Sequence, residues 1–100
     1  MHPISLFITG MLFCNSVPHL VCGLQGQRFP TPFAKPRGIG LSSPLVNFVW
    51  GFANLLVALA LYARHPAALD ANADTLAMLA GVAVLGVFSA VHFGKVRNAA

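Results

Sequence analysis

Three long apolar stretches and two polar connections alternate along the chain. The apolar stretches cover residues 4–24, 44–63 and 75–93, and each is about 20 residues long. A helix of that length spans about 30 Å, which is the thickness of the hydrocarbon core of a bilayer. The pattern therefore predicts an all-α integral membrane protein with three transmembrane helices in a single domain, residues 1–100.

Residues typical of helix ends flank the second and third stretches. Ser43 offers a capping hydroxyl, and Pro44 suits the first position of the second helix. Residues 64–66, Arg-His-Pro, are expected to end that helix because proline cannot continue it. We expect Asp74 to cap the third helix and Gly94 to end it.

The composition supports the membrane assignment. Hydrophobic residues make up 57% of the chain and charged residues 8%, whereas a soluble domain is about 25% charged. A soluble domain with so few charges would expose large apolar patches, which lipid tails solvate in a membrane. The net charge of +4 does not indicate nucleic-acid binding, because the six Lys and Arg residues lie outside the apolar stretches.

The distribution of Lys and Arg predicts how the chain lies in the membrane. The connection at 25–43 holds three of these cations and the C-terminal tail holds two, whereas the other connection holds one beside two aspartates. Because cytoplasmic segments carry an excess of Lys and Arg, we expect the N-terminus outside and the C-terminus in the cytoplasm. The protein is thus expected to cross the cell inner membrane several times. The cations of the predicted cytoplasmic loop are Arg28, Lys35 and Arg37.

The predicted cytoplasmic loop is rich in proline and aromatic residues. Pro30, Pro32 and Pro36 exclude a helix and favour extended backbone, and Phe29 and Phe33 lie between the cations. Since a solvated linker does not need two phenylalanines, the loop is either a connector at the lipid headgroups or a flap that covers a site between the helices. A proline-rich ligand for a partner domain is a third interpretation.

Each apolar stretch carries one stripe of small and polar residues at helical spacing. Polar side chains inside a membrane usually face protein or a cavity, and small residues let helix backbones approach closely. We therefore expect a bundle with the stripes inside. Asn15 and Asn54, both near the midplane, are expected partners, and Gly51 and Gly81 are expected at helix contacts. The stripes are Met11, Asn15, His19 and Cys22; Asn47, Trp50, Gly51, Asn54 and Ala58; and Ala77, Gly81, Leu85, Ser89 and His92.

Four polar residues form the best candidate site, at the end of the bundle near the predicted cytoplasmic loop. The helical rise places His19 about 7 Å and Asn47 about 4–5 Å below the membrane boundary and His92 near the boundary itself, so these three residues and Ser89 can converge below the loop. Pro18 lies beside His19 and leaves one carbonyl without its helical partner. The simplest alternatives are a structural hydrogen bond from His19 to Asn47 or a loop carbonyl, and an interfacial position for His92.

The run His19-Leu20-Val21-Cys22-Gly23, with Arg28 after it, resembles over about ten residues a histidine–glycine–arginine run in the membrane anchors of succinate dehydrogenase. That resemblance implies a b-type haem with His19 as a ligand. Two axial ligands must reach one iron, and His19 and His92 differ in depth by about 6 Å, which counts against the haem. A metal site formed by His19, Cys22 and His92 is a further alternative.

No motif in the sequence indicates a particular enzymatic reaction. It has no glycine-rich phosphate loop, no paired carboxylates, no Cys-x-x-Cys and no serine elbow, so an enzyme is not favoured. We expect an accessory subunit or a self-associating membrane component. The alternatives are an oligomeric transporter or channel, and a haem- or quinone-associated anchor that uses His19. The expected partners are membrane lipid and either further copies of the chain or a larger membrane complex.

Overall fold

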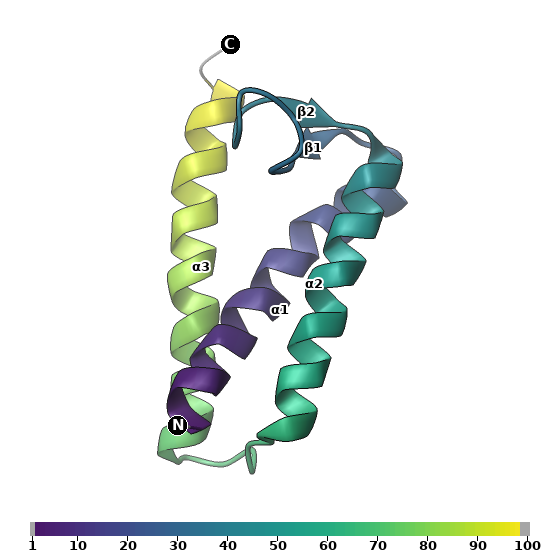
Figure 1. The fold of residues 1–100 in the computed structure, drawn as a ribbon. Coiled ribbons are helices and arrows are strands. Elements are labelled where there is room, and N and C mark those ends of the chain that lie inside the picture. The colour runs from purple at the N-terminus through teal and green to yellow at the C-terminus, as the bar shows by residue number, and fades with distance from the viewer. Residues whose placement is uncertain (1, 99–100) are drawn as a thin grey trace.

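Three helices and a short hairpin make up the computed structural model, which describes residues 2–98 (Figure 1). The helices are α1 (His2–Leu24), α2 (Pro44–Arg64) and α3 (Ala73–Asn98), and the strands are β1 (Phe29–Pro30) and β2 (Leu41–Ser42). The strands pair antiparallel within the connection between α1 and α2. All three helices are long and apolar enough to cross a membrane, so the predicted fold class is confirmed.

Both ends of α2 lie where the sequence predicts them. The Ser43 hydroxyl accepts a hydrogen bond from the backbone N–H of Val46 over 3.2 Å, and Pro44 is the first residue of the helix. The helix ends at Arg64, and the backbone N–H of His65 donates to the carbonyl of Leu61 over 3.0 Å. Local capping chemistry therefore determines this element.

The predicted ends of α3 are wrong by one or more residues. The cap is Asn72, whose side-chain oxygen accepts from the backbone N–H of Thr75 over 2.8 Å, while Asp74 lies in the first turn. Gly94 does not end the helix, which continues to Asn98. Lys95 and Arg97 follow Gly94, and their positive charges stabilise the C-terminal turn of a helix. This explains why α3 continues past Gly94.

The N-terminal half of α1 packs directly against the first half of α3. A Cβ atom added at Gly81 would collide with the carbonyl of Phe7, and one added at Gly10 would collide with the carbonyl of Met78. The two backbones therefore touch where these helices cross, as small residues in membrane helices allow.

The C-terminal half of α1 packs in the same way against α2. A Cβ atom added at Gly51 would lie 2.9 Å from the backbone nitrogen of Leu20 and 3.0 Å from the carbonyl oxygen of Ser16. Because α1 changes partner along its length, α2 and α3 barely contact each other, and they diverge at the end of the bundle that carries β1 and β2 (Figure 1).

Residues 25–43, called the covering loop from here on, fill the space between the diverging helices (Figure 1). The Phe29 ring is 5% exposed, and its centroid lies 5.3 Å from that of His19 on α1 and 4.7 Å from that of Phe93 on α3. The Phe33 ring meets the indole of Trp50 on α2 edge-on, with centroids 5.2 Å apart. The covering loop thus contacts all three helices, as a flap between them does.

Candidate functional site

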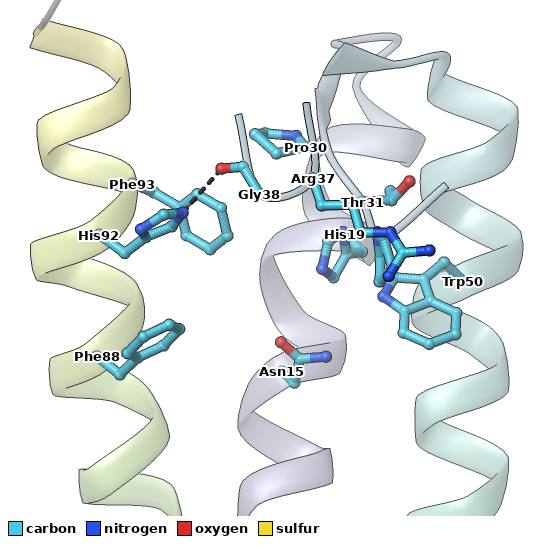
Figure 2. A pocket seen from close by; sticks show the side chains of 11 residues that line it. Asn15, His19, Pro30, Thr31, Arg37, Gly38, Trp50, Phe88, His92 and Phe93 are labelled. Carbon is cyan, nitrogen blue, oxygen red and sulfur yellow. Dashed lines mark hydrogen bonds between the residues drawn. The ribbon is translucent and has the colours of Figure 1, made fainter. Parts of the chain in front are cut away.

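A cavity of about 380 Å³ lies beneath the covering loop and between the three helices (Figure 2). This volume falls at the small end of the usual range for small-molecule sites, about 300–1,000 Å³. Helix α1 contributes two polar side chains to its wall, and α2, α3 and the covering loop contribute mainly aromatic rings, prolines and one arginine. The lining residues are Asn15, His19, Pro30, Thr31, Pro32, Arg37, Gly38, Trp50, Phe88, His92 and Phe93.

Asn47 is fully buried, and its side chain joins the covering loop to α1. Its amide nitrogen donates to the carbonyls of Phe29, Ser42 and Ser43 over 2.9, 3.2 and 3.1 Å. These three acceptors fix the orientation of the amide, because only nitrogen can donate to a carbonyl. The side-chain oxygen of Asn47 therefore faces His19, whose Nδ1 lies 2.8 Å away.

This orientation determines the tautomer of the neutral His19 ring. An amide oxygen only accepts, so His19 Nδ1 carries the proton and donates it to Asn47. Nε2 is then the unprotonated nitrogen of the ring. His19 is 3% exposed and lines the cavity, and within residues 2–98 Nε2 has no hydrogen-bond partner. The cavity wall thus holds a lone pair that accepts no bond from the described residues.

Hydrogen bonds also fix the orientation of the Asn15 side chain, which lies one helical turn before His19. Asn54 Nδ2 donates to the carbonyl of Trp50 over 2.9 Å, so Asn54 Oδ1 accepts from Asn15 Nδ2 over 3.1 Å. The expected pairing of Asn15 with Asn54 is therefore present. Figure 2 shows the Asn15 side chain with its nitrogen toward α2 and its oxygen toward α3. A second acceptor therefore lines the cavity.

His92 holds the covering loop against α3. Its Nε2 lies 2.8 Å from the carbonyl oxygen of Gly38, and its ring stacks on that of Phe88 with centroids 5.6 Å apart (Figure 2). A carbonyl only accepts, so Nε2 is the donor in this bond. Gly38 has a φ of +75°, a backbone conformation that side chains disfavour, and a Cβ there would lie 3.0 Å from His92 Nε2. A glycine at this position therefore allows the contact.

Arg37 is the cation of the covering loop that lines the cavity. The two acidic residues of the chain, Asp70 and Asp74, lie in the α2–α3 connection and the first turn of α3, at the opposite end of the bundle (Figure 1). No carboxylate side chain therefore lies near the Arg37 guanidinium. All three cations of the loop are exposed, but Arg28 and Lys35 do not line this cavity.

The structure brings together three of the four predicted site residues. His19 and Asn47 are bonded, and His92 lines the same cavity. Ser89 instead borders grooves on another side of α1 and α3, because it is rotated by about 100° from its neighbour Phe88, which faces the cavity. Sequence reasoning missed the roles of Phe88 and Phe93 on α3. Phe88 lies four residues before His92 and Phe93 directly after it, but apolar residues are spread around α3, so the sequence does not indicate which of its faces lines a cavity.

The ring nitrogens with a free lone pair are Nε2 of His19 and Nδ1 of His92, because the other nitrogen of each ring donates a hydrogen bond, to Asn47 and to the Gly38 carbonyl. Cys22 borders a different groove from the one that His19 and His92 share. Within residues 2–98, no three His, Cys, Asp or Glu side chains form a group that could hold a metal ion.

Comparisons of the chain with protein-family models, curated proteins and solved structures found no match. The function is therefore inferred from the geometry of the cavity.

Proposed function

We propose that this small membrane protein is a non-catalytic component of the membrane that binds a lipid-soluble molecule in the cavity beneath its covering loop. The observation that carries this proposal is the unpartnered Nε2 of His19. Nε2 is an acceptor in the wall of a largely apolar cavity, and no described residue donates to it. A ligand that donates a hydrogen bond can therefore bind there without displacing a bond of the protein.

The acceptors of α1 indicate what such a ligand offers. Asn15 and His19 are four residues apart, or about 6 Å along the helix axis, and the Asn15 side-chain oxygen and His19 Nε2 are both acceptors. The rest of the wall is largely apolar or aromatic, with Trp50, Phe88 and Phe93 as its large rings. A molecule with a polar group that donates hydrogen bonds and an apolar body matches this wall, as small-molecule sites generally combine few polar groups with an apolar lining.

The surroundings of His19 favour binding over catalysis. A histidine base acts on a nucleophile or substrate within hydrogen-bond reach, and the described residues place no hydroxyl or thiol at Nε2. Cys22 and Ser89 border another groove, and both aspartates lie at the far end of the bundle. The same lack of a membrane carboxylate argues against energised proton transport.

Trp50 allows a direct test, because it is the only tryptophan and it lines the cavity. Brominated amphiphiles quench tryptophan on contact, so a ligand in the cavity should quench purified protein in detergent at saturating concentration. Excess unbrominated ligand should restore the fluorescence. We expect His19→Gln to fold normally, since glutamine can still donate to Asn47, but to bind at least about tenfold more weakly, because an amide oriented to donate to Asn47 does not place its oxygen where Nε2 lies.

The matched control is His2→Gln, the same substitution at an exposed residue at the start of α1. It should bind like the wild type. Quenching that never saturates, or a His19→Gln variant that binds as tightly as the wild type, would contradict the proposed function.

A second observation favours self-association as an additional role. Ser89 and Gly86 on α3 border an apolar groove against Cys14 and Pro18 of α1. Serines and glycines on membrane helices commonly contact another helix. If a second copy packs there, the mass of the protein in mild detergent should exceed one chain, and Gly86→Leu should reduce it to one.

A further inference from the structure

From the placement of Arg37, we infer that the ligand carries an acidic headgroup, held between Arg37 and His19, with its apolar tail lying along α1 and α2 toward the middle of the membrane. This inference rests on the proposed function and adds the chemical class of the ligand. Three features carry it: an arginine and an acceptor nitrogen that line the same cavity, and an apolar groove that shares Trp50 with that cavity.

Arg37 lies at the rim of the cavity, because it lines the cavity wall and is also exposed. Its neighbour Gly38 is bonded to His92 on α3, which anchors this part of the loop beside the cavity. A guanidinium at the edge of a largely apolar pocket can hold an anion there through charge-assisted hydrogen bonds. The chain supplies no acidic side chain at this end of the bundle, so an anion at Arg37 comes from outside the chain.

An acidic headgroup satisfies Arg37 and His19 together. The O–H of a carboxylic acid or a phosphate monoester donates to His19 Nε2, and its other oxygen accepts from the Arg37 guanidinium. If the proton moves fully to Nε2, the result is an imidazolium and an arginine on either side of one anion, with the same total charge. An alcohol would satisfy His19 but leave Arg37 without an anion. A quaternary ammonium group has no proton to donate and would repel Arg37.

An apolar groove shows where the tail would lie. It continues from Trp50 along α2, and its other lining residues are Leu12, Ala53, Asn54 and Val57. Leu12, Asn15 and His19 follow helical spacing on one face of α1, and Trp50, Ala53 and Val57 do so on α2. The groove therefore shares Trp50 with the cavity and lies farther from the covering loop along both helices. A ligand with its headgroup at Arg37 and its tail along this groove would be oriented like a lipid in one leaflet of a bilayer.

The test compares two Trp50 quenchers of equal chain length, a bromododecanoic acid and a bromododecanol. The wild type should bind the acid at least about tenfold more tightly, which is the usual worth of a charge-assisted hydrogen bond. Arg37→Gln should lower affinity for the acid to that for the alcohol and leave affinity for the alcohol unchanged. Arg28→Gln, which removes the same charge from an exposed position in the same loop, should behave like the wild type.

Competitors distinguish an amphiphile from a small anion. Dodecyl phosphate and dodecanoic acid should both displace the brominated acid, since both headgroups offer an O–H and an anionic oxygen. Acetate and inorganic phosphate should not displace it at the same concentrations. Displacement by these small ions as effective as by the amphiphiles would overturn the inference and indicate an anion site without a tail groove.

The outcomes separate this inference from the proposed function. If the alcohol binds as tightly as the acid, or if Arg37→Gln keeps the preference for the acid, the acidic headgroup is wrong while the cavity remains a binding site. If neither quencher saturates, the proposed function itself fails. Circular dichroism melting of Arg37→Gln checks that the variant is folded, as its exposed position in the loop predicts.

Discussion

The two halves of α1 differ in how they pack against α3. In its N-terminal half, Gly10 and Gly81 bring the backbones of α1 and α3 into direct contact, with no room for a side chain. In its C-terminal half, α1 keeps its close contact with α2 but is separated from α3 by the covering loop, whose Phe29 packs between His19 and Phe93 (Figure 1).

The difference follows from where the polar side chains lie. Backbones can touch where the facing residues are small, because helices already satisfy their own backbone hydrogen bonds. Asn47 and His19 instead need partners that a neighbouring helix backbone cannot offer, and the loop carbonyls of Phe29 and Ser42 supply them. Bringing those carbonyls within reach holds α3 away from α2, and the cavity is the space that remains.

The largest effect is expected where the backbones touch. Gly81→Leu should destabilise the fold by about 3 kcal/mol or more, because its first side-chain atom already collides with the Phe7 carbonyl and the helices must separate. The measurement is thermal unfolding in detergent, followed by circular dichroism. Gly94→Leu is the control on the same helix, since a Cβ there meets no atom within 4 Å. Equal melting of the two variants would mean that α1 and α3 do not touch as described.

A smaller effect is expected from Asn47→Leu at the covering loop. The leucine fills a similar volume but loses the bonds to His19 and to three loop carbonyls, so we expect a loss of about 2 kcal/mol. Trypsin should then cut after Arg37 faster than in the wild type, because the loop is released. Asn54→Leu breaks the pairing with Asn15 and the bond within α2 to the Trp50 carbonyl but no bond to the loop, so it should cost about 1 kcal/mol and leave cleavage of the loop unchanged. Slow cleavage in Asn47→Leu would show that the loop is held without Asn47.

The smallest effect on the fold is expected from a test of topology, which measures on which side of the membrane each end of the bundle lies. The excess of Lys and Arg at the end with the covering loop predicts that this end lies in the cytoplasm. Single cysteines at positions 35 and 70, in a background with Cys14 and Cys22 replaced by alanine, would report it. An impermeant thiol reagent should label position 70 in intact cells, and position 35 only after permeabilisation. The reverse pattern would invert the predicted topology.

The features that the sequence determined are those that depend on one helix at a time or on depth in the membrane. Apolar length predicts three spans, and capping chemistry places both ends of α2. Helical spacing and depth were sufficient to pair Asn15 with Asn54 and to bring Asn47 within reach of His19. These predictions succeed because a membrane fixes the axis of each helix, so that sequence position becomes a depth.

The tertiary structure alone decided how the helices are rotated and what lies between them. Ser89 and His92 are three residues apart, yet only His92 lines the cavity. The prolines of the covering loop exclude a helix but do not indicate whether the loop lies at the headgroups or between α2 and α3. That choice depends on contacts from Phe29, Phe33 and Gly38 to three different helices. Such contacts join residues far apart in the chain, and their energies exist only when all the partners are in place.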